Sequence, residues 1–248
     1  MWDKPAELNY LSSVLLGMTV LLLLIGALHY VLHRPEFKLR AVVLNHAPQQ
    51  LDVAQVKAAL QSELLGNFFT VDLEQTRRTF EKLPWVRKVS VRRHFPWKLE
   101  VDIEEHSALA RWNDSEWVNT YGEIFAVDSG PVAAILPAFF GHPDSSAEVT
   151  QMYRAFSEQL SLLQQPIAQV YLSPRRAWQL RLKSGLLVKL GRDQAQQRLA
   201  RFVAVYPWSG IGNQESGISD AVPQYVDLRY RNGFAVKYQP RAGSGETS

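Results

Sequence analysis

The sequence predicts an α+β protein in which one N-terminal membrane helix carries a two-domain body. Three observations support this prediction. Residues 11–31 form an apolar run without any Asp, Glu, Lys or Arg. Residues 86–104 alternate apolar and charged side chains on both sides of a proline, which is the pattern of a half-buried hairpin. Residues after 107 contain several short strand-like segments and two helical patterns.

The apolar run is long enough to cross a membrane. At ~1.5 Å per residue, a helix over these residues spans roughly 31 Å, about the thickness of the hydrocarbon core. A signal peptide has a shorter apolar region followed by small residues, whereas this run has Leu24, Ile25 and Leu28 near its end. We therefore predict an uncleaved transmembrane helix over residues 11–32, preceded by a short tail at residues 1–10.

Charge does not place the body on one side of the membrane. Lys4 precedes the run, and Arg34, Lys38 and Arg40 follow it, which weakly favours a cytoplasmic body. The formal net charge is +3, far from the strong basic bias of nucleic-acid-binding proteins. The chain has no cysteine, so it has no disulfide scaffold.

Residues 36–106 predict a first domain with the order β-α-α-β-β. A strand is expected at residues 37–44, and a helix capped by Asp52 covers residues 53–64. A second helix begins at the cap residue Asp72 and is stopped by Pro84. The hairpin follows, with apolar residues on one face only, so helices should cover one side of the sheet.

Residues 107–240 predict a β-rich domain with an antiparallel sheet and packed helices. Capping patterns at Ser145 with Glu148, and at Asp193 with Gln196, mark two helix starts. The expected strands cover residues 108–112, 116–119, 169–172, 178–183, 186–190, 224–228 and 234–238. Residues 241–248 are small and polar and are expected to form a disordered tail.

The sequence predicts no catalytic, cofactor-binding or metal-ligating residues, and hence no enzyme. None of the six histidines lies in an H-E-x-x-H pattern, and no G-x-S-x-G or G-x-x-x-x-G-K motif occurs. Basic pairs such as Arg92-Arg93 are interpreted as solvated faces, not as nucleic-acid contacts.

The final strand is the best candidate for a binding surface. No structured segment is expected after it, so it should lie at a sheet edge, where unpaired backbone groups accept another strand. Phe234, Val236 and Tyr238 should share one face, and Lys237 should lie on the other.

Two sets of motifs carry a family resemblance. Residues 83–93 (LPWVRKVSVRR) and 99–105 (LEVDIEE), placed soon after a membrane anchor, resemble a POTRA domain. With residues 110–113 (ARWN), 178–180 (WQL), 190–192 (LGR), 198–202 (RLARF) and 225–230 (YVDLRY), the chain resembles the FtsQ/DivIB family of bacterial cell-division proteins. Members of the family often have a longer, basic cytoplasmic tail than residues 1–10. The resemblance therefore implies no role for the tail of this chain.

The resemblance implies a non-enzymatic scaffold of the bacterial inner membrane, with a cytoplasmic N-terminus and a periplasmic body at the division septum. It implies FtsB, paired with FtsL, as a partner of the last strand and the preceding corner, through Arg229, Tyr230, Gly233, Phe234, Val236 and Tyr238. It also implies FtsK as a partner of the exposed POTRA strand near Val91 and Arg93. No cofactor is implied.

Two other functions remain open at this point. A POTRA module of an outer-membrane translocation system would be expected to have several POTRA copies and a following barrel. A membrane-tethered cell-wall hydrolase would need a nucleophile or a metal set, and a turnover assay on peptidoglycan separates it from a scaffold.

Overall fold

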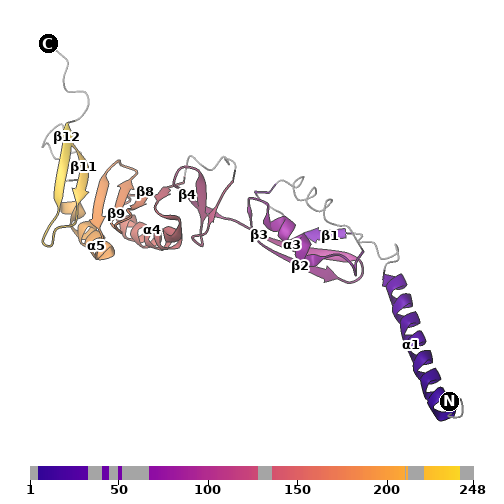
Figure 1. The fold of residues 1–248 in the computed structure, drawn as a ribbon. Coiled ribbons are helices and arrows are strands. Elements are labelled where there is room, and N and C mark those ends of the chain that lie inside the picture. The colour runs from indigo at the N-terminus through magenta and orange to yellow at the C-terminus, as the bar shows by residue number, and fades with distance from the viewer. Residues whose placement is uncertain are drawn as a thin grey trace. The chain divides into compact units, whose positions relative to one another are not determined.

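The structure, a computed structural model, describes residues 5–32, 41–44, 50–51, 67–127, 136–209, 211 and 221–240 (Figure 1). It divides into two compact units, Met1–Glu105 and His106–Ser248. The predicted helix at residues 53–64, the first part of the strand predicted at 37–44 and the tail at 241–248 lie outside the described residues.

The apolar run forms helix α1, Pro5–Leu32. Its segment Asn9–Val31 is long and apolar enough to cross a membrane, and none of it is buried inside the protein. Side chains such as Leu16 and Leu23 are 69% and 68% exposed, which suits contact with lipid on all sides. The helix begins before residue 11, because residues 5–10 continue it without a break.

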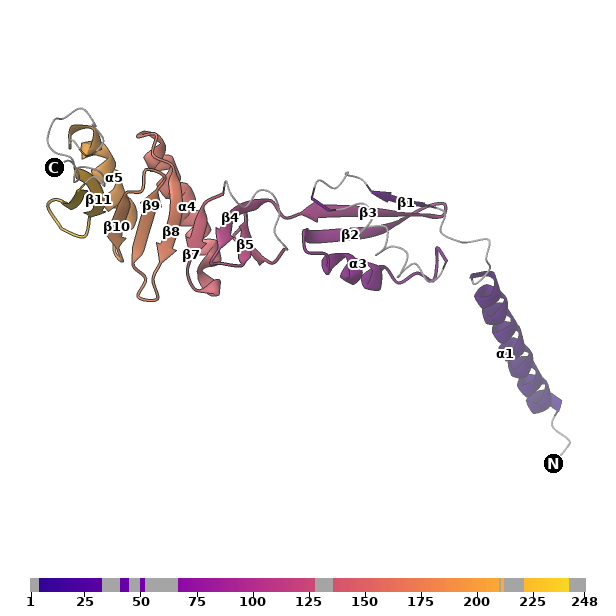
Figure 2. The same cartoon turned by 90° about the horizontal axis from the view of Figure 1, so that it is seen from above.

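The first unit contains a three-stranded sheet. Its strands are β1 (Ala41–Leu44), β2 (Val86–His94) and β3 (Lys98–Glu105), in the order β1-β3-β2. β2 and β3 form the predicted antiparallel hairpin, and β1 pairs in parallel with β3 (Figure 2).

Helix α3, Leu73–Glu81, packs against β2 and buries Phe80 against the apolar face of the sheet. Asp72 caps this helix as predicted, because its carboxylate accepts hydrogen bonds from the backbone N–H groups of Glu74 and Gln75. Val89 and Val101 lie beneath the helix and are almost completely buried, so the alternation in the hairpin does mark one covered face.

The second unit contains a nine-stranded sheet in the order β12-β11-β10-β9-β8-β7-β4-β5-β6. Its strands are β4 (Ala108–Trp112), β5 (Glu116–Asn119), β6 (Ile124–Phe125), β7 (Ala138–Phe140), β8 (Ile167–Leu172), β9 (Trp178–Leu182), β10 (Leu187–Gly191), β11 (Ala221–Asp227) and β12 (Ala235–Pro240). Its helices are α4 (Ser146–Ser161) and α5 (Ala195–Val205), with short 3-10 turns η3 (Pro143–Ser145) and η4 (Tyr206–Trp208).

This sheet is mixed, which corrects the prediction of an antiparallel sheet. β4 pairs in parallel with β7, β7 with β8, and β10 with β11. The last two pairs are joined through α4 and α5, and a helical crossover returns the chain so that the next strand runs in the same direction. The sequence pattern located both helices but did not show which strands they connect.

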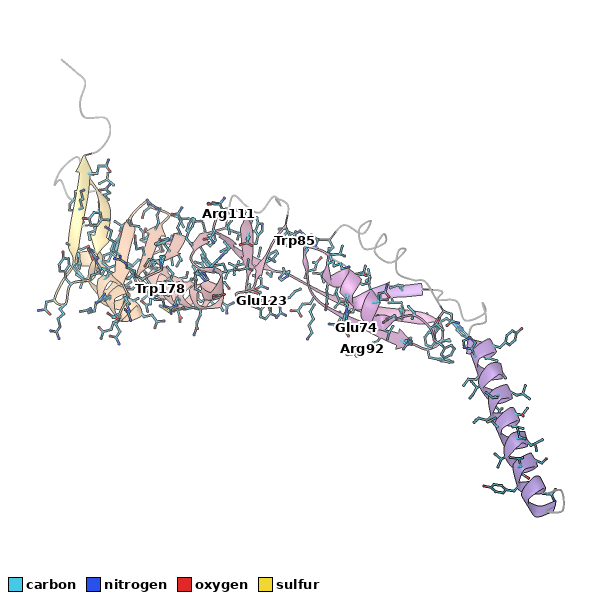
Figure 3. The ribbon with its side chains drawn as sticks, viewed as in Figure 1. Glu74, Trp85, Arg92, Arg111, Glu123 and Trp178 are labelled. Carbon is cyan, nitrogen blue, oxygen red and sulfur yellow. The ribbon has the colours of Figure 1, made fainter. Side chains whose placement is uncertain are left out.

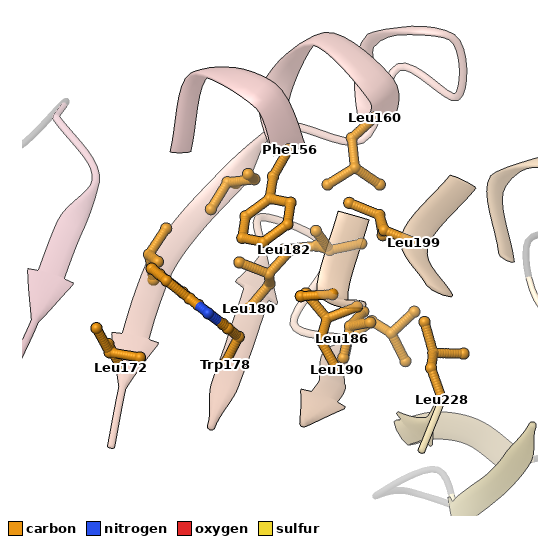
Figure 4. Packing of buried hydrophobic residues seen from close by; sticks show 14 of the residues in the cluster. Phe156, Leu160, Leu172, Trp178, Leu180, Leu182, Leu186, Leu190, Leu199 and Leu228 are labelled. Atoms are coloured by element: carbon orange, nitrogen blue, oxygen red, sulfur yellow. The ribbon is translucent and has the colours of Figure 1, made fainter. Parts of the chain in front are cut away.

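Both helices cover one face of the sheet and share its core (Figure 4). Phe156 and Leu160 of α4 and Leu199 of α5 are almost completely buried against the strands. The ring of Phe156 meets that of Trp178 edge-on, with 5.8 Å between the ring centroids. Burial of these side chains holds the central strands in place.

Two predicted helix caps in this unit are wrong. The Ser145 side chain makes no cap, because its hydroxyl donates instead to the carbonyl of His142 at 2.6 Å and closes turn η3. Helix α5 begins one residue later than the predicted cap Asp193 implies, after Gln194, whose backbone is left-handed with φ 56°. Side chains of this type compete between turns and caps, so the local pattern alone does not decide.

Candidate protein-binding edges

Strand β12 forms one edge of the nine-stranded sheet, as predicted from its position near the end of the chain. It pairs with β11 on one side, and no other described strand lies on its second side. The pairing contains a bulge between Pro223 and Tyr225, which shifts the register near the end of the hairpin. The outer side of β12 therefore presents backbone groups that another strand can pair with.

The inner face of this edge is anchored to the core. Phe234, just before β12, meets Phe202 of α5 edge-on, with ring centroids 5.7 Å apart. Val236 lies opposite Val226, and both Phe234 and Val236 pack against the core cluster of the unit. These contacts fix the strand, so a partner would meet an already ordered edge.

Two tyrosines beside this edge are exposed. Tyr238 is 48% exposed and lies opposite Pro223, and Tyr230 is 58% exposed in the connector between β11 and β12. Gly233 is also exposed, and a Cβ added there would meet no atom within 4 Å. A larger residue would therefore fit at position 233 without a steric clash. The two tyrosine rings present apolar surface with a polar hydroxyl at the tip.

The opposite face of the edge carries positive charge. The Lys189 ammonium lies over the Tyr225 ring, 4.0 Å from its centroid, and that of Lys237 lies 6.0 Å from the same centroid. Lys237 is therefore on the face away from the core, as the alternation predicted.

Arg229 is engaged within the chain. Its guanidinium donates to both carboxylate oxygens of Asp227, with the shortest bond 2.6 Å from Nη2 to Oδ2. The Asp227 side chain is 8% exposed, whereas that of Arg229 is 60% exposed. Hydrogen bonds from the Arg229 guanidinium hold the pKa of Asp227 below its ordinary value, against the opposing effect of burial.

Two further arginines of α5 hold the turns next to this edge. Arg201 donates to the carbonyl of Arg231 at 2.9 Å, and Arg198 donates to the carbonyl of Leu190 at 2.7 Å. Gly191 has a φ of 79°, and a Cβ there would approach the Arg198 guanidinium to 2.7 Å. A glycine is therefore needed where β10 passes beneath these side chains.

The second predicted site lies on β2, which forms one edge of the three-stranded sheet among the described strands. Val91 lies opposite Val101, is half-buried and packs against the small core of that unit. Arg93 is on the same face as Val91, because side chains two residues apart in a strand point the same way.

Arg93 ties the hairpin to the turn that precedes helix α3. Its Nε donates to the carbonyl of Phe68 at 2.9 Å, and its Nη2 donates to those of Val71 at 2.8 Å and Phe69 at 3.4 Å. Asn67 closes the same turn, since its side-chain oxygen accepts the backbone N–H groups of Phe69 and Thr70. The Arg93 side chain thus has a role inside the domain as well as at its edge.

Among the residues that the structure describes, no group of three or more His, Cys, Asp or Glu side chains is placed to hold a metal ion. A pocket of about 480 Å³ lies where β4, β7 and β8 end, and Phe140, Pro143, Tyr171 and Pro174 supply much of its lining.

Several residues that shape the edge of β12 are not among the site residues that the sequence predicts. Asp227 lies in the motif at residues 225–230 and is the acceptor for Arg229. The sequence does carry a signal for this ion pair, since side chains two residues apart at the end of a strand point to the same face of the sheet. The roles of Arg198 and Arg201 carried no such signal, because their acceptors are backbone carbonyls distant in sequence or in a turn.

Two family profiles match consecutive parts of the chain. Residues 37–106 match the FtsQ-type POTRA domain, and residues 110–229 match the C-terminal domain of cell division protein FtsQ/DivIB. The first match contains the three-stranded sheet and α3, and the second contains most of the nine-stranded sheet but ends before β12.

Curated relatives match over almost the whole chain. A protein of Nitrosospira multiformis is 38% identical over 249 residues, which cover 96% of this chain and 99% of that protein. One of Burkholderia pseudomallei is 36% identical, covering 96% and 94%. One of Escherichia coli K12 is 33% identical, covering 94% and 82%. Each of these relatives is a cell division protein FtsQ.

Removal of the Arg93 guanidinium should loosen the first unit. We expect Arg93→Ala to lower the free energy of unfolding by about 1–2 kcal/mol, because it leaves three backbone carbonyls without their charged donor. The measurements are denaturant unfolding of the full chain in detergent micelles and hydrogen exchange of residues 68–71.

Arg92→Ala is the matched control, since Arg92 (labelled in Figure 3) is exposed and, one residue before Arg93 in the strand, points to the other face of β2. We expect it to change stability by less than about 0.5 kcal/mol. Equal effects of the two substitutions would contradict the role assigned to Arg93.

The Asp227 carboxylate should stabilise the fold in a pH-dependent way. A carboxyl whose pKa is lowered on folding adds stability above its unfolded pKa, about 4, and this contribution disappears as pH falls through the folded value. We therefore expect Asp227→Asn to be less stable than the original chain at pH 7, with the difference closing as pH falls below 4. Denaturant unfolding of both chains at pH 7 and at pH 3 measures this difference in the free energy of unfolding.

Asp193→Asn serves as the control, because the Asp193 side chain is 79% exposed and its nearest Arg192 contact is 4.0 Å. It should leave stability almost unchanged at either pH. A constant difference between Asp227→Asn and the original chain from pH 7 to pH 3 would refute the proposed coupling to Arg229.

Proposed function

Because this chain belongs to the FtsQ/DivIB family of cell division proteins, we propose that it is a non-enzymatic scaffold that holds other division proteins together at the membrane. The observation that carries this proposal is the exposed, ordered edge of β12. Helix α1 supplies the anchor, and the two units of the body supply binding surfaces.

A strand of the partner would add to β12. Backbone hydrogen bonds would supply affinity, and side-chain contacts would supply specificity. FtsB, itself paired with FtsL, is the partner that the family resemblance implies. Its contacts would include the exposed ring of Tyr238, the connector residue Tyr230 and the outward parts of Phe234 and Val236.

Arg229 and Gly233 would contribute differently to this contact. The exposed guanidinium of Arg229 is already oriented by Asp227, so it can meet a polar group of the partner without losing its ion pair. Gly233 would let the partner backbone approach the connector closely, since no side chain projects there.

The edge of β2 is proposed as a second contact, with FtsK as the implied partner. Val91 and Arg93 lie on the covered face of the hairpin, so a partner there would chiefly use the outer backbone of β2. Val91 and Arg93 would then act by holding the strand in shape.

We propose that the chain spans the bacterial inner membrane once, with residues 1–10 in the cytoplasm and the body in the periplasm at the division septum. The support for this topology is the family and the single apolar helix near the N-terminus. A fluorescent fusion should gather at mid-cell, whereas a translocation module or a cell-wall hydrolase has no need of that position. A hydrolase would in addition turn over peptidoglycan.

Tyr238→Ala should weaken the β12 contact. We expect the affinity for the periplasmic segment of FtsB to fall by more than about 1 kcal/mol, or roughly fivefold or more, because an aromatic anchor is lost. Titration of a labelled FtsB segment into the full chain in micelles measures the change. Phe234→Ala should weaken binding as well, but it also removes the contact with Phe202.

Tyr121→Ala is the matched control, since Tyr121 is an equally large exposed tyrosine outside β11 and β12. It should leave the affinity unchanged. If the segment binds Tyr238→Ala and the original chain with the same affinity, the assignment of this edge is wrong.

A further inference from the structure

The turn between β2 and β3, with the strand ends beside it, gathers aromatic and basic residues, of which only Arg93 belongs to a proposed partner site. Residues 92–98 read RRHFPWK and contain no acid. Phe95 is 74% exposed, which is unusual for a side chain of this size, and Lys98 is exposed beside it. We call residues 92–98 the hairpin tip.

The hairpin tip is part of a larger aromatic cluster. The Phe95 ring lies 6.5 Å from the Phe68 ring and 6.3 Å from that of Trp97, measured between centroids. Phe68 is buried beneath them and also meets Phe69, which is 43% exposed, edge-on at 5.2 Å. Phe68 therefore supports a set of rings of which Phe95 and Phe69 reach the surface.

Arg93 makes this cluster rigid. Its bonds to the carbonyls of Phe68 and Phe69 join the tip to the turn at residues 67–70. The exposed rings are consequently held together by two segments distant in the sequence, and they do not depend on a single loop.

The strand pairing places the hairpin tip at the end of the sheet where β1, the first strand after helix α1, begins. β1 runs parallel to β3, and its first residue, Ala41, lies opposite Lys98 at the tip (Figure 2). The opposite end of β3, at Glu105, leads into the second unit. The chain that leaves α1 thus enters the domain at the end of the sheet where the tip lies.

The connection to the membrane span is short. From Val31, the end of the apolar span, to Ala41 the chain can reach at most about 35 Å, even when fully extended. The hairpin tip is therefore held within reach of the membrane surface, whichever side of the membrane the body occupies.

We propose that the hairpin tip docks on the membrane surface next to the anchor. Phe95 and Phe69 would enter the interfacial region, and Trp97, half-buried beside them, would lie at headgroup level, where aromatic rings are favoured. Arg92 and Lys98 would attract anionic headgroups. Of the proposed function, this inference uses only the membrane-spanning role of α1.

A lipid surface fits these observations better than a protein groove does. The tip combines exposed rings with cations and lacks acids within residues 92–98, and the chain itself keeps it near a bilayer. Docking would give the domain a second attachment beside α1, and would so restrict how the edge of β2 is presented to a partner.

Fluorescence quenching in vesicles tests this inference. The chain has no cysteine, so single reporters can be introduced at the tip with His94→Cys and at the far end of β2 with Lys88→Cys. The full chain is reconstituted in phosphatidylcholine vesicles with phosphatidylglycerol and a doxyl-labelled phospholipid. The label at position 94 should be quenched several-fold more strongly than that at 88, and less so without phosphatidylglycerol.

Phe95→Ala should lower the ratio of docked to undocked tips by about tenfold, because burial of a phenylalanine side chain is worth at least that factor. Lys98→Glu should lower quenching in the anionic vesicles only. A label at Lys88→Cys, introduced separately into Phe95→Ala and into Lys98→Glu, should show the same quenching as in the original chain. Changed quenching at position 88 would instead indicate that the variant has lost its fold.

Equal quenching at positions 94 and 88, or quenching that Phe95→Ala leaves unchanged, would overturn the inference. A tip that binds a partner protein instead would stay unquenched in these vesicles, which contain no protein other than this chain, and that result would also overturn the inference. Binding of the FtsB segment to the same vesicles reports on the β12 edge separately, so either proposal can fail while the other stands.

Discussion

The parallel pairing of β11 with β10 determines where the large sheet ends. Helix α5 connects the two strands and lies on the core face, so the chain returns to add β11 in the same direction as β10. The short connector after β11 can then only turn back, and β12 becomes the outermost described strand. The same helix supplies Phe202, which receives Phe234 and holds this strand against the unit. One helix therefore both creates the edge and orders it.

Near the edges formed by β2 and β12, arginine side chains mainly form hydrogen bonds within the chain. Arg93 donates to carbonyls of the turn before α3, and Arg201 to that of the connector between β11 and β12. Arg229 is held by Asp227, whose carboxylate is buried. The planar guanidinium offers several donors in a fixed geometry, so one side chain can join segments far apart in the sequence. The charge of these arginines is typical of partner-binding surfaces, yet Arg93 and Arg201 also hold backbone carbonyls in place and Arg229 also pairs with Asp227.

Ordering of this kind bears on the proposed binding function. A partner strand that meets a mobile edge would lose affinity to the entropy of fixing it. Here the backbone at both edges is already constrained by packing on one face, while its outer groups and a few rings remain at the surface. The proposed scaffold function and the proposed docking of the hairpin tip both depend on rigid surfaces carried on a chain with one membrane-spanning candidate helix. Each needs position and shape, and neither needs a reactive group.

Local sequence patterns are sufficient to predict the apolar helix α1, the hairpin, helix α3 with its Asp72 cap, and the edge position of the last strand. These depend on local patterns: an unbroken apolar run, strict alternation, and a capping side chain within a few residues of the groups that it satisfies. The motifs at residues 83–105 and 225–230 also carry the family resemblance, which depends on no tertiary contact.

The mixed direction of the large sheet, the strands β6 and β7, and the partners of Arg93 and Arg229 depend on the three-dimensional arrangement of the chain. Parallel or antiparallel pairing depends on which strands become neighbours, and short strands of two or three residues carry no periodic signal. Ser145 failed as a cap because its hydroxyl found a closer acceptor in its own turn. Hydrogen-bond partners are chosen by distance in space, and a sequence pattern records only distance along the chain.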